Sequence, residues 1–312
     1  KRIRATGNPG GVGHNWVKAA FVDPKPPLEI WKTPKDEGGM LRQYVPARLE
    51  DNPTLLENDP EYENRLEGIG SPELVKAMRH GIWDIVAGGM FDDVWGPGVV
   101  FEPFAIPRTW YVGRCFDWGS SKPYAAYVCA ESNGEEVQLA DGTWRTFPRG
   151  SVFLVGEEYG WNGKPNEGLR LTDAEIARRV IEMEAGLQLA APVRPGPADA
   201  AIYAVTDGES TAQRLERAGA RYEAAAKGPG SRVSGWQKMR EMLKAAKEGD
   251  REKPGLYVFS RCRQFIRTLP TLPRDAKKPD DIDTDAEDHA ADAVRYRISA
   301  EKHSVEYGSL LI

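Results

Sequence analysis

The pattern of hydrophobic and polar positions changes near residue 110. Between residues 24 and 62 the chain is rich in Pro, Asp and Asn and has little period, which indicates loops and short helices. Residues 71–91 begin with Ser-Pro-Glu and space Leu74, Met78 and Ile82 along one face, so they predict an amphipathic helix. We place a domain boundary in the connector 95–110, which gives regions 1–110 and 111–312.

Strand-like and helical patterns alternate from residue 111 onward. Three apolar runs separated by turn residues predict a meander of strands at 111–119, 124–132 and 151–161. They are followed by an expected helix at 172–187, strand at 198–205, helices at 210–220 and 234–249, strand at 255–259 and closing helix at 285–301. This order predicts an α/β domain with a mixed sheet flanked by helices, preceded by a smaller, mostly helical and loop-rich region.

Composition excludes some classes of protein. The 312 residues are 40% hydrophobic and 29% charged, as in soluble globular proteins, and no run approaches the roughly 18 apolar residues of a membrane span. The basic, polar start lacks the apolar core of a signal peptide, and three cysteines without a CxxC pair suit a reducing compartment. We therefore expect an intracellular protein without a structural zinc site, in which Cys115, Cys129 and Cys262 are buried.

Charge is distributed unevenly along the chain, although the formal net charge is −5. Residues 210–255 hold eleven Lys or Arg against six acids, whereas residues 275–292 hold eight acids against two lysines. A basic surface beside an acidic cluster would suit a metal-dependent enzyme that acts on phosphodiesters. Two solvated faces would give the same pattern.

Three aspartates are the candidates for chemistry. Asp117 ends an apolar run and Asp199 lies at the start of the expected strand 198–205, but an aspartate at either place is also typical of a turn or cap. In the closing segment, Asp285, Asp288, His289 and Asp292 are spaced to share one stripe of a helix. A solvated acidic helix start explains Asp285 and Asp288 well, but it explains Asp292 poorly because its neighbours are apolar.

Three carboxylates from three elements of one sheet would be enough to hold two divalent cations. Such a pair activates a water and stabilises the leaving oxygen in phosphodiester hydrolysis. Ligation by oxygen atoms alone favours Mg²⁺ or Mn²⁺.

Motifs spanning nearly the whole chain resemble the large subunit of tailed-phage terminases, which packages and cuts genomic DNA. They read ATGNPGGVGHNWVKAAF, YVPARLEDNPTLLENDPEYENRLEGI, GIWDIVAGGMF, CFDWGSSKPYAAYV, ADAAIY and EDHAADAVRYRI. The resemblance implies that residues 1–110 are a remnant of the ATPase core with a linker subdomain and that residues 111–312 form a ribonuclease H-like nuclease. It places the metal-binding acids at Asp117, Asp199 and Asp292, with His289 nearby. From the residues themselves we add Asp288 and Asp207 as accessory acids, although the sequence around Asp207 better suits a turn and a helix cap.

The chain departs from that family at its start. It has no Gly-rich phosphate loop ending in Gly-Lys-Ser/Thr, so we expect a C-terminal fragment that does not hydrolyse ATP by itself. The resemblance implies double-stranded DNA, the portal protein and the small subunit as partners, and the host cytoplasm as the location. Our candidates for DNA backbone contacts are Lys122, Arg214, Arg217, Arg221, Lys238 and Lys244.

Two other functions remain open from the sequence. A junction resolvase or transposase-like nuclease could use the same acids, but it would not explain residues 1–110. A catalytically silent docking module of the packaging motor could hold a stabilising cation with them.

Overall fold

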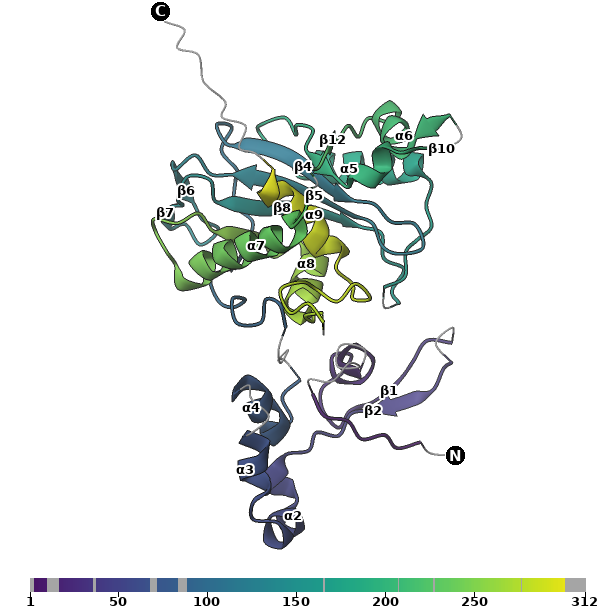
Figure 1. The fold of residues 1–312 in the computed structure, drawn as a ribbon, viewed down its shortest axis with the longest axis vertical. Coiled ribbons are helices and arrows are strands. Elements are labelled where there is room, and N and C mark those ends of the chain that lie inside the picture. Colours follow the sequence, from purple (N-terminus) through teal and green to yellow (C-terminus); the bar gives the residue numbers. More distant parts are fainter. Residues whose placement is uncertain are drawn as a thin grey trace, which may run out of the picture. The chain divides into compact units, whose positions relative to one another are not determined.

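The computed structural model describes residues 3–9, 17–35, 38–67, 72–83, 89–164, 166–206, 208–226, 228–275 and 277–300. Two compact units are present, Lys1–Asp93 with Pro270–Asp283, and Val94–Leu269 with Thr284–Ile312 (Figure 1). Residues 94–110, which the sequence grouped with the first region, lie in the second unit. There β3 (Val100–Phe101) pairs in parallel with β13 (Leu256–Phe259).

The first unit consists of short elements, in keeping with its Pro-rich sequence. Strands β1 (Ile30–Lys32) and β2 (Leu41–Gln43) form an antiparallel hairpin. The short helices are η1 (Lys18–Val22), η2 (Leu49–Asp51), α2 (Pro53–Asn58), α3 (Tyr62–Glu67) and α4 (Pro72–His80).

The helix expected over 71–91 is shorter than predicted. It ends at His80, because Gly81 has a φ of 64°, a left-handed conformation that ends a helix readily. A Cβ at Gly81 would also lie 2.5 Å from the carbonyl oxygen of Ala47. In the part of the chain that is described, no helix is both long and apolar enough to cross a membrane.

Within the described residues, the second unit is built on a mixed sheet of seven strands in the order β12-β9-β4-β5-β8-β13-β3. The predicted meander is present as β4 (Tyr111–Asp117), β5 (Ala125–Glu131) and β8 (Val152–Tyr159), which pair antiparallel. On the other side of β4, β9 (Pro197–Ala198) and β12 (Glu223–Ala224) continue the sheet in parallel. The predicted α/β fold, a mixed sheet flanked by helices, is confirmed.

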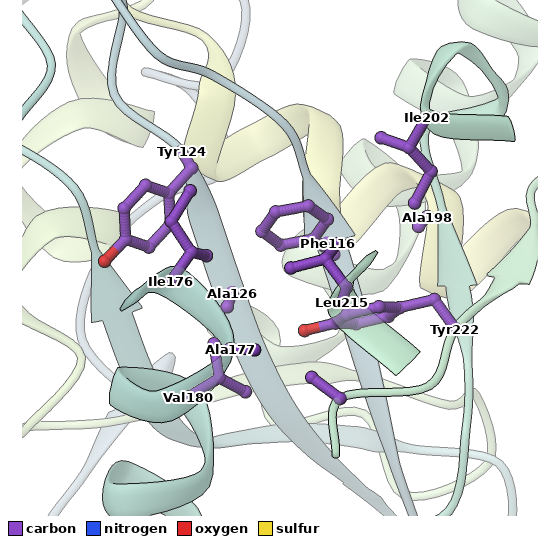
Figure 2. Close-up of a cluster of buried hydrophobic side chains, with 11 residues drawn as sticks. Phe116, Tyr124, Ala126, Ile176, Ala177, Val180, Ala198, Ile202, Leu215 and Tyr222 are labelled. Carbon is purple, nitrogen blue, oxygen red and sulfur yellow. The ribbon is translucent and has the colours of Figure 1, made fainter. Parts of the chain in front are cut away.

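The two faces of this sheet have different roles, because successive side chains of a strand point to opposite faces. Phe116 lies on one face in a buried cluster with Ile176 of α5 (Asp173–Gly186) and Leu215 of α6 (Thr211–Arg217), as Figure 2 shows. Asp117, the next residue, points to the opposite face, where it meets α9 (His289–Ser299). The end of β4 therefore presents its carboxylate to the closing helix.

Helices α7 (Ser231–Glu248) and α9 pack closely against each other. Gly235 makes this approach possible, since a Cβ there would lie 2.6 Å from Cγ of Arg295.

The other described elements in this part of the chain are short. They are the hairpin of β6 (Glu136–Gln138) and β7 (Trp144–Thr146), the pair β10 (Val205–Thr206) and β11 (Glu209–Ser210), and the helices η3 (Ala200–Tyr203), α8 (Arg263–Thr268) and η4 (Leu269–Thr271). The three cysteines are buried, as expected.

Two further predicted elements, in the second unit, were wrong in their bounds. Residues 198–205 do not form one strand, because the Asp199 side chain accepts the N–H of Ala201 at 2.9 Å and thereby caps η3. The closing helix begins at His289 rather than at residue 285, and Asp288 is its N-cap residue. Asp285 therefore lies before the helix and is not part of a helical stripe with Asp292.

Candidate functional site

Asp117 is the most deeply placed carboxylate of the site. It is only 6% exposed, its Oδ2 lies 3.2 Å from Nδ1 of His289, and its Oδ1 accepts the hydroxyl of Tyr296 at 3.4 Å. Burial raises the pKa of Asp117 to about 7, and the negative charges of Asp292 and Asp288 add to the effect, while His289 opposes it. A cation at this position would relieve the unfavourable burial of the charge.

Asp199 lies beside Asp117 at the end of the neighbouring parallel strand. Ala198 pairs with Phe116, and the N–H of Asp199 donates to the carbonyl oxygen of Phe116 at 3.1 Å. Gly196 permits the two strands to approach, since a Cβ there would lie 2.0 Å from the carbonyl oxygen of Arg114. The register of the sheet therefore brings two of the predicted ligands to the same edge.

Tyr296 of α9 contacts Asp117 and is affected by the charges of Asp292 and Asp199. Burial raises the pKa of the Tyr296 phenol, and the negative charges of Asp117, Asp292 and Asp199 raise it further. The phenol thus lies in the electrostatic field of all three predicted ligands. Sequence reasoning missed Tyr296, although it lies one helical turn after Asp292 and its spacing could have placed it on the same face.

Two arginines neutralise the acids at the start of α9. Asp292, which is 7% exposed, accepts from Nε of Arg295 at 2.8 Å and from Nη1 of Arg232 at 3.0 Å. Arg232 also donates through Nη2 to Asp288 at 2.8 Å. Burial and the charge of Asp292 raise the pKa of Asp288, and Arg232 opposes this rise. Among the described residues, no group of three or more His, Cys, Asp or Glu side chains is arranged to hold a metal ion.

Asn166 holds His289 from the loop after β8. Its Nδ2 lies 3.3 Å from the carbonyl oxygen of Asp285 and 3.5 Å from that of Ala286, so its Oδ1 is the atom that faces Nε2 of His289, at 3.0 Å. Burial lowers the pKa of His289, but the hydrogen bond to Asp117 and the surrounding acids outweigh burial and raise it. Asn166 was not predicted; its only sequence signal is an Asn in a polar loop, where it takes a left-handed φ of 54°.

The residue before Asp288 is also fixed. Glu287 accepts the hydroxyl of Tyr159 at 2.9 Å and a hydrogen bond from Nη1 of Arg267 at 3.2 Å, and the Arg267 guanidinium lies over the ring of Trp161. The start of α9 is therefore held by β8, α8 and the loop that follows β8.

The predicted DNA contacts are divided between the two faces of the sheet. Arg214 and Arg217 belong to α6, on the face opposite Asp117, and are paired with Asp173 and Glu209; Arg221 lies 3.6 Å from Glu216. On α7, Lys238 donates to the carbonyl oxygen of Ile298 and Lys244 lies 3.9 Å from Glu248.

Lys122 and Asp207 complete the predicted set. Lys122 is exposed in the turn that follows Asp117. Asp207 lies outside the described residues, as do residues 10–16 of the first terminase-like motif.

Comparison with known proteins finds no matching family model and no matching curated protein. Among solved structures, the nuclease domain of the P22 large terminase matches at 19% identity and a TM-score of 0.45, over 67% of this chain and 92% of that chain. The large terminase of a thermophilic bacteriophage in complex with ADP matches at 16% identity and a TM-score of 0.49, over 96% of this chain and 61% of that chain.

The large terminase nuclease from thermophilic phage G20c with bound cobalt matches at 11% identity and a TM-score of 0.41, over 69% of this chain and 98% of that chain. This chain spans less than two thirds of the full-length large terminase that it matches.

Proposed function

We propose that this chain is the metal-dependent endonuclease part of a phage DNA-packaging terminase large subunit, in which residues 111–312 form the nuclease. Residues 1–110 would be the end of the ATPase core and the linker, and the chain alone would not hydrolyse ATP. The observation that carries the proposal is the place of the buried Asp117, which lies next to Asp199 at the ends of two neighbouring strands and contacts His289 and Tyr296 of the helix that carries Asp292. The terminase-like motifs support DNA packaging as its setting.

The three acids suit Mg²⁺ or Mn²⁺ in donor chemistry, because both ions prefer carboxylate oxygens. Asp117 fits best, since it is buried and a nearby cation would favour its ionised form. Two bound ions would supply an activated water and neutralise the leaving oxygen of the phosphodiester. His289 and Tyr296 would orient the Asp117 carboxylate, and Asp288 would be an accessory acid.

We also propose the partners of this chain, on the basis of its terminase-like motifs. Double-stranded DNA would be the substrate, and the portal protein and terminase small subunit would be the protein partners in the host cytoplasm. No membrane is involved in this proposal.

A catalytically silent docking module is the second candidate. The observation that favours it is the double neutralisation of Asp292 by Arg232 and Arg295, which leaves this carboxylate satisfied without a metal. In that case the acids would stabilise the fold rather than cut DNA.

Alanine substitutions separate the two candidates. If the chain is a nuclease, Asp117→Ala, Asp199→Ala and Asp292→Ala should each lower the rate of metal-dependent DNA cleavage by more than about a thousandfold, as expected of groups that act as a unit. Asp141→Ala, in the exposed turn of the β6–β7 hairpin, is the matched control and should cleave at the wild-type rate. Wild-type protein that cuts no DNA with either metal would favour the docking module.

A further inference from the structure

Two loops leave the sheet at the edge where Asp117 lies. Asp117 pairs with Ala125, and Ala125 pairs with Tyr159, so the ends of β4 and β8 lie in one row across the sheet. Residues 118–123 follow β4, and residues 160–164 and 166–170 follow β8. We call these segments the rim loops; residue 165 lies outside the described residues.

Backbone hydrogen bonds join the rim loops to each other. The N–H of Gly168 donates to the carbonyl oxygen of Ser121 at 2.8 Å, and the N–H of Arg170 donates to that of Ser120 at 3.1 Å. Gly168 has no room for a side chain, since a Cβ would lie 2.2 Å from the carbonyl oxygen of Lys122. Asn166, in the same loop, contacts His289, so both loops are fixed relative to Asp117.

The rim loops carry three cations that no acid neutralises. Lys122, Lys164 and Arg170 are exposed, and within the described residues their side chains have no hydrogen bond or ion pair. The single acid of the rim loops is Glu167, whose carboxylate accepts from the amide of Asn162 at 3.1 Å. The two loops together therefore have a net charge of about +2 at neutral pH.

Three arginines on the opposite face of the sheet differ from these cations because they are paired with acidic side chains. The side chains of Arg178, Arg217 and Arg221 are also exposed, at 66%, 72% and 66%, but each is paired with an acid. Their partners are Glu182, Glu209 and Glu216. A phosphate that approached them would have to compete with a carboxylate already in place.

We propose that the rim loops bind the sugar-phosphate backbone of the DNA strand next to Asp117, with Lys122, Lys164 and Arg170 as the phosphate contacts. The inference rests on the proposed nuclease function and names the surface that would bring the strand to the acids. Exposed Lys and Arg side chains on loops suit phosphates, which carry charge but no sequence information, so binding would tolerate any sequence. Arg170 takes a left-handed φ of 55°, which a non-glycine residue adopts at an energetic cost and which is often found at functional sites.

Equilibrium DNA binding tests this surface without requiring catalysis. The probe is a fluorescent duplex of about 20 base pairs in EDTA, with affinity measured by anisotropy between about 50 and 200 mM salt, the range over which phosphate contacts lose most affinity. The rim variant is Lys122→Gln/Lys164→Gln/Arg170→Gln. The matched control, Arg178→Gln/Arg217→Gln/Arg221→Gln, removes the same charge from exposed positions on the other face. Circular dichroism melting would verify that both variants are folded.

We expect the rim variant to bind at least roughly tenfold more weakly at 100 mM salt and to lower the slope of log Kd against log salt by about 2 to 3, since each phosphate contact contributes about 0.9. The control should change affinity less than about twofold, because its arginines are already neutralised.

An equal loss of DNA affinity in both variants, or a rim variant that binds DNA as tightly as wild type, would overturn the proposed surface. Neither result would contradict the proposed nuclease function. Unchanged DNA binding would make an acidic protein surface the partner to test for these loops. Wild-type protein that binds no duplex under any of these salt conditions would overturn the proposed function itself.

Discussion

At the residue scale, Asn166 determines how His289 meets Asp117. Because the amide nitrogen of Asn166 faces two carbonyl oxygens, its oxygen accepts from Nε2 of His289 and leaves Nδ1 toward the carboxylate. Groups that orient the neighbours of a metal ligand typically change activity by about 10- to 100-fold when they are removed. Asn166 is therefore a positioning residue in the proposed reaction.

Asn166→Gly should remove this control of His289 without backbone strain, because glycine accepts the left-handed φ. We expect a loss of cleavage of about 10- to 100-fold. We also expect a changed tautomer pattern for one imidazole in ¹H–¹⁵N NMR, which a purely structural role would not alter. The chain has four histidines, so His289→Gln identifies the signal. Imidazole nitrogen shifts equal to wild type would show that Asn166 does not orient the ring.

Glu157, in the middle of β8, gives a prediction for pH. Burial raises its pKa, although the backbone N–H groups of Gln264 and Phe265, each at 2.8 Å, oppose the rise. A carboxyl with a higher pKa in the folded state holds its proton more tightly there, so it stabilises the fold at low pH. That contribution is lost as pH rises from about 4.3 through the folded pKa.

Glu157→Gln should abolish this pH dependence. The difference in unfolding free energy, wild type minus variant, should fall as pH rises from about 4 to about 7, as linkage requires for a raised carboxyl pKa. Urea denaturation at several pH values measures it. A difference that grows with pH would mean that the Glu157 carboxylate is stabilised, rather than penalised, by its surroundings.

Single residues also mark how far the sequence can predict the site. Asp117 was predicted because it ends an apolar run, Asp199 because it lies at the start of an expected strand, and Asp292 because a solvated helix start does not explain an acid among apolar neighbours. Asn166 and Arg232 reach the site from loops and helices 123 and 60 positions away from their partners in the chain. The spacing of apolar and polar residues does not indicate contacts between distant positions, so they could not be predicted from one sequence.

At the element scale, α7 and α9 hold the acids in their present arrangement. Arg232 is in the first turn of α7, where the helix dipole disfavours a cation, and the carboxylates of Asp288 and Asp292 compensate for this. Its side chain is 31% exposed, whereas that of Arg295 is 8% exposed. Arg232 is therefore the more accessible of the two arginines that would compete with a metal ion at the proposed site.

Arg232→Gln should accordingly strengthen the binding of Mn²⁺ in the absence of DNA. We expect roughly tenfold tighter binding by calorimetry, because a competing cation next to two carboxylates is removed, and tenfold corresponds to about 1.4 kcal/mol. Lys244→Gln, on the same helix and 62% exposed, removes an equal charge and should leave the affinity unchanged. Weaker binding by Arg232→Gln would indicate that Arg232 organises the acids for the metal rather than competing with it.

The presence of helices and strands was predicted better than the residues at which they begin and end. The meander and most of the helices were predicted from the spacing of apolar residues, and Thr172, the first residue of the expected helix 172–187, is the N-cap of α5. The early end of β9 follows from the Asp199 side chain, which caps η3. The late start of α9 leaves Asp288 at the N-cap position, where its side chain pairs with Arg232 of α7 instead of capping the helix. Helix and strand propensities alone do not predict these contacts, so they did not predict where β9 ends and α9 begins.

At the scale of the whole molecule, the described site residues lie in the second unit. The uneven charge seen in the sequence is partly cancelled there, because Arg232 from the basic segment pairs with Asp288 and Asp292 from the acidic one. The basic excess of residues 210–255 is therefore partly balanced by carboxylates of the same unit. Within the described residues, the rim-loop cations Lys122, Lys164 and Arg170 have no such partner, which is why we propose them as the DNA contacts.

The central claim is that Asp117 belongs to a metal-dependent nuclease centre, and plasmid cleavage tests it most directly. Purified protein would be incubated with supercoiled plasmid and Mn²⁺, Mg²⁺ or EDTA, beside Asp117→Asn, which keeps the size of the side chain and removes its charge. We predict conversion to linear DNA by the wild type with either metal, none with EDTA, and none by the variant. Cleavage by Asp117→Asn at the wild-type rate, or cleavage in EDTA, would contradict the claim.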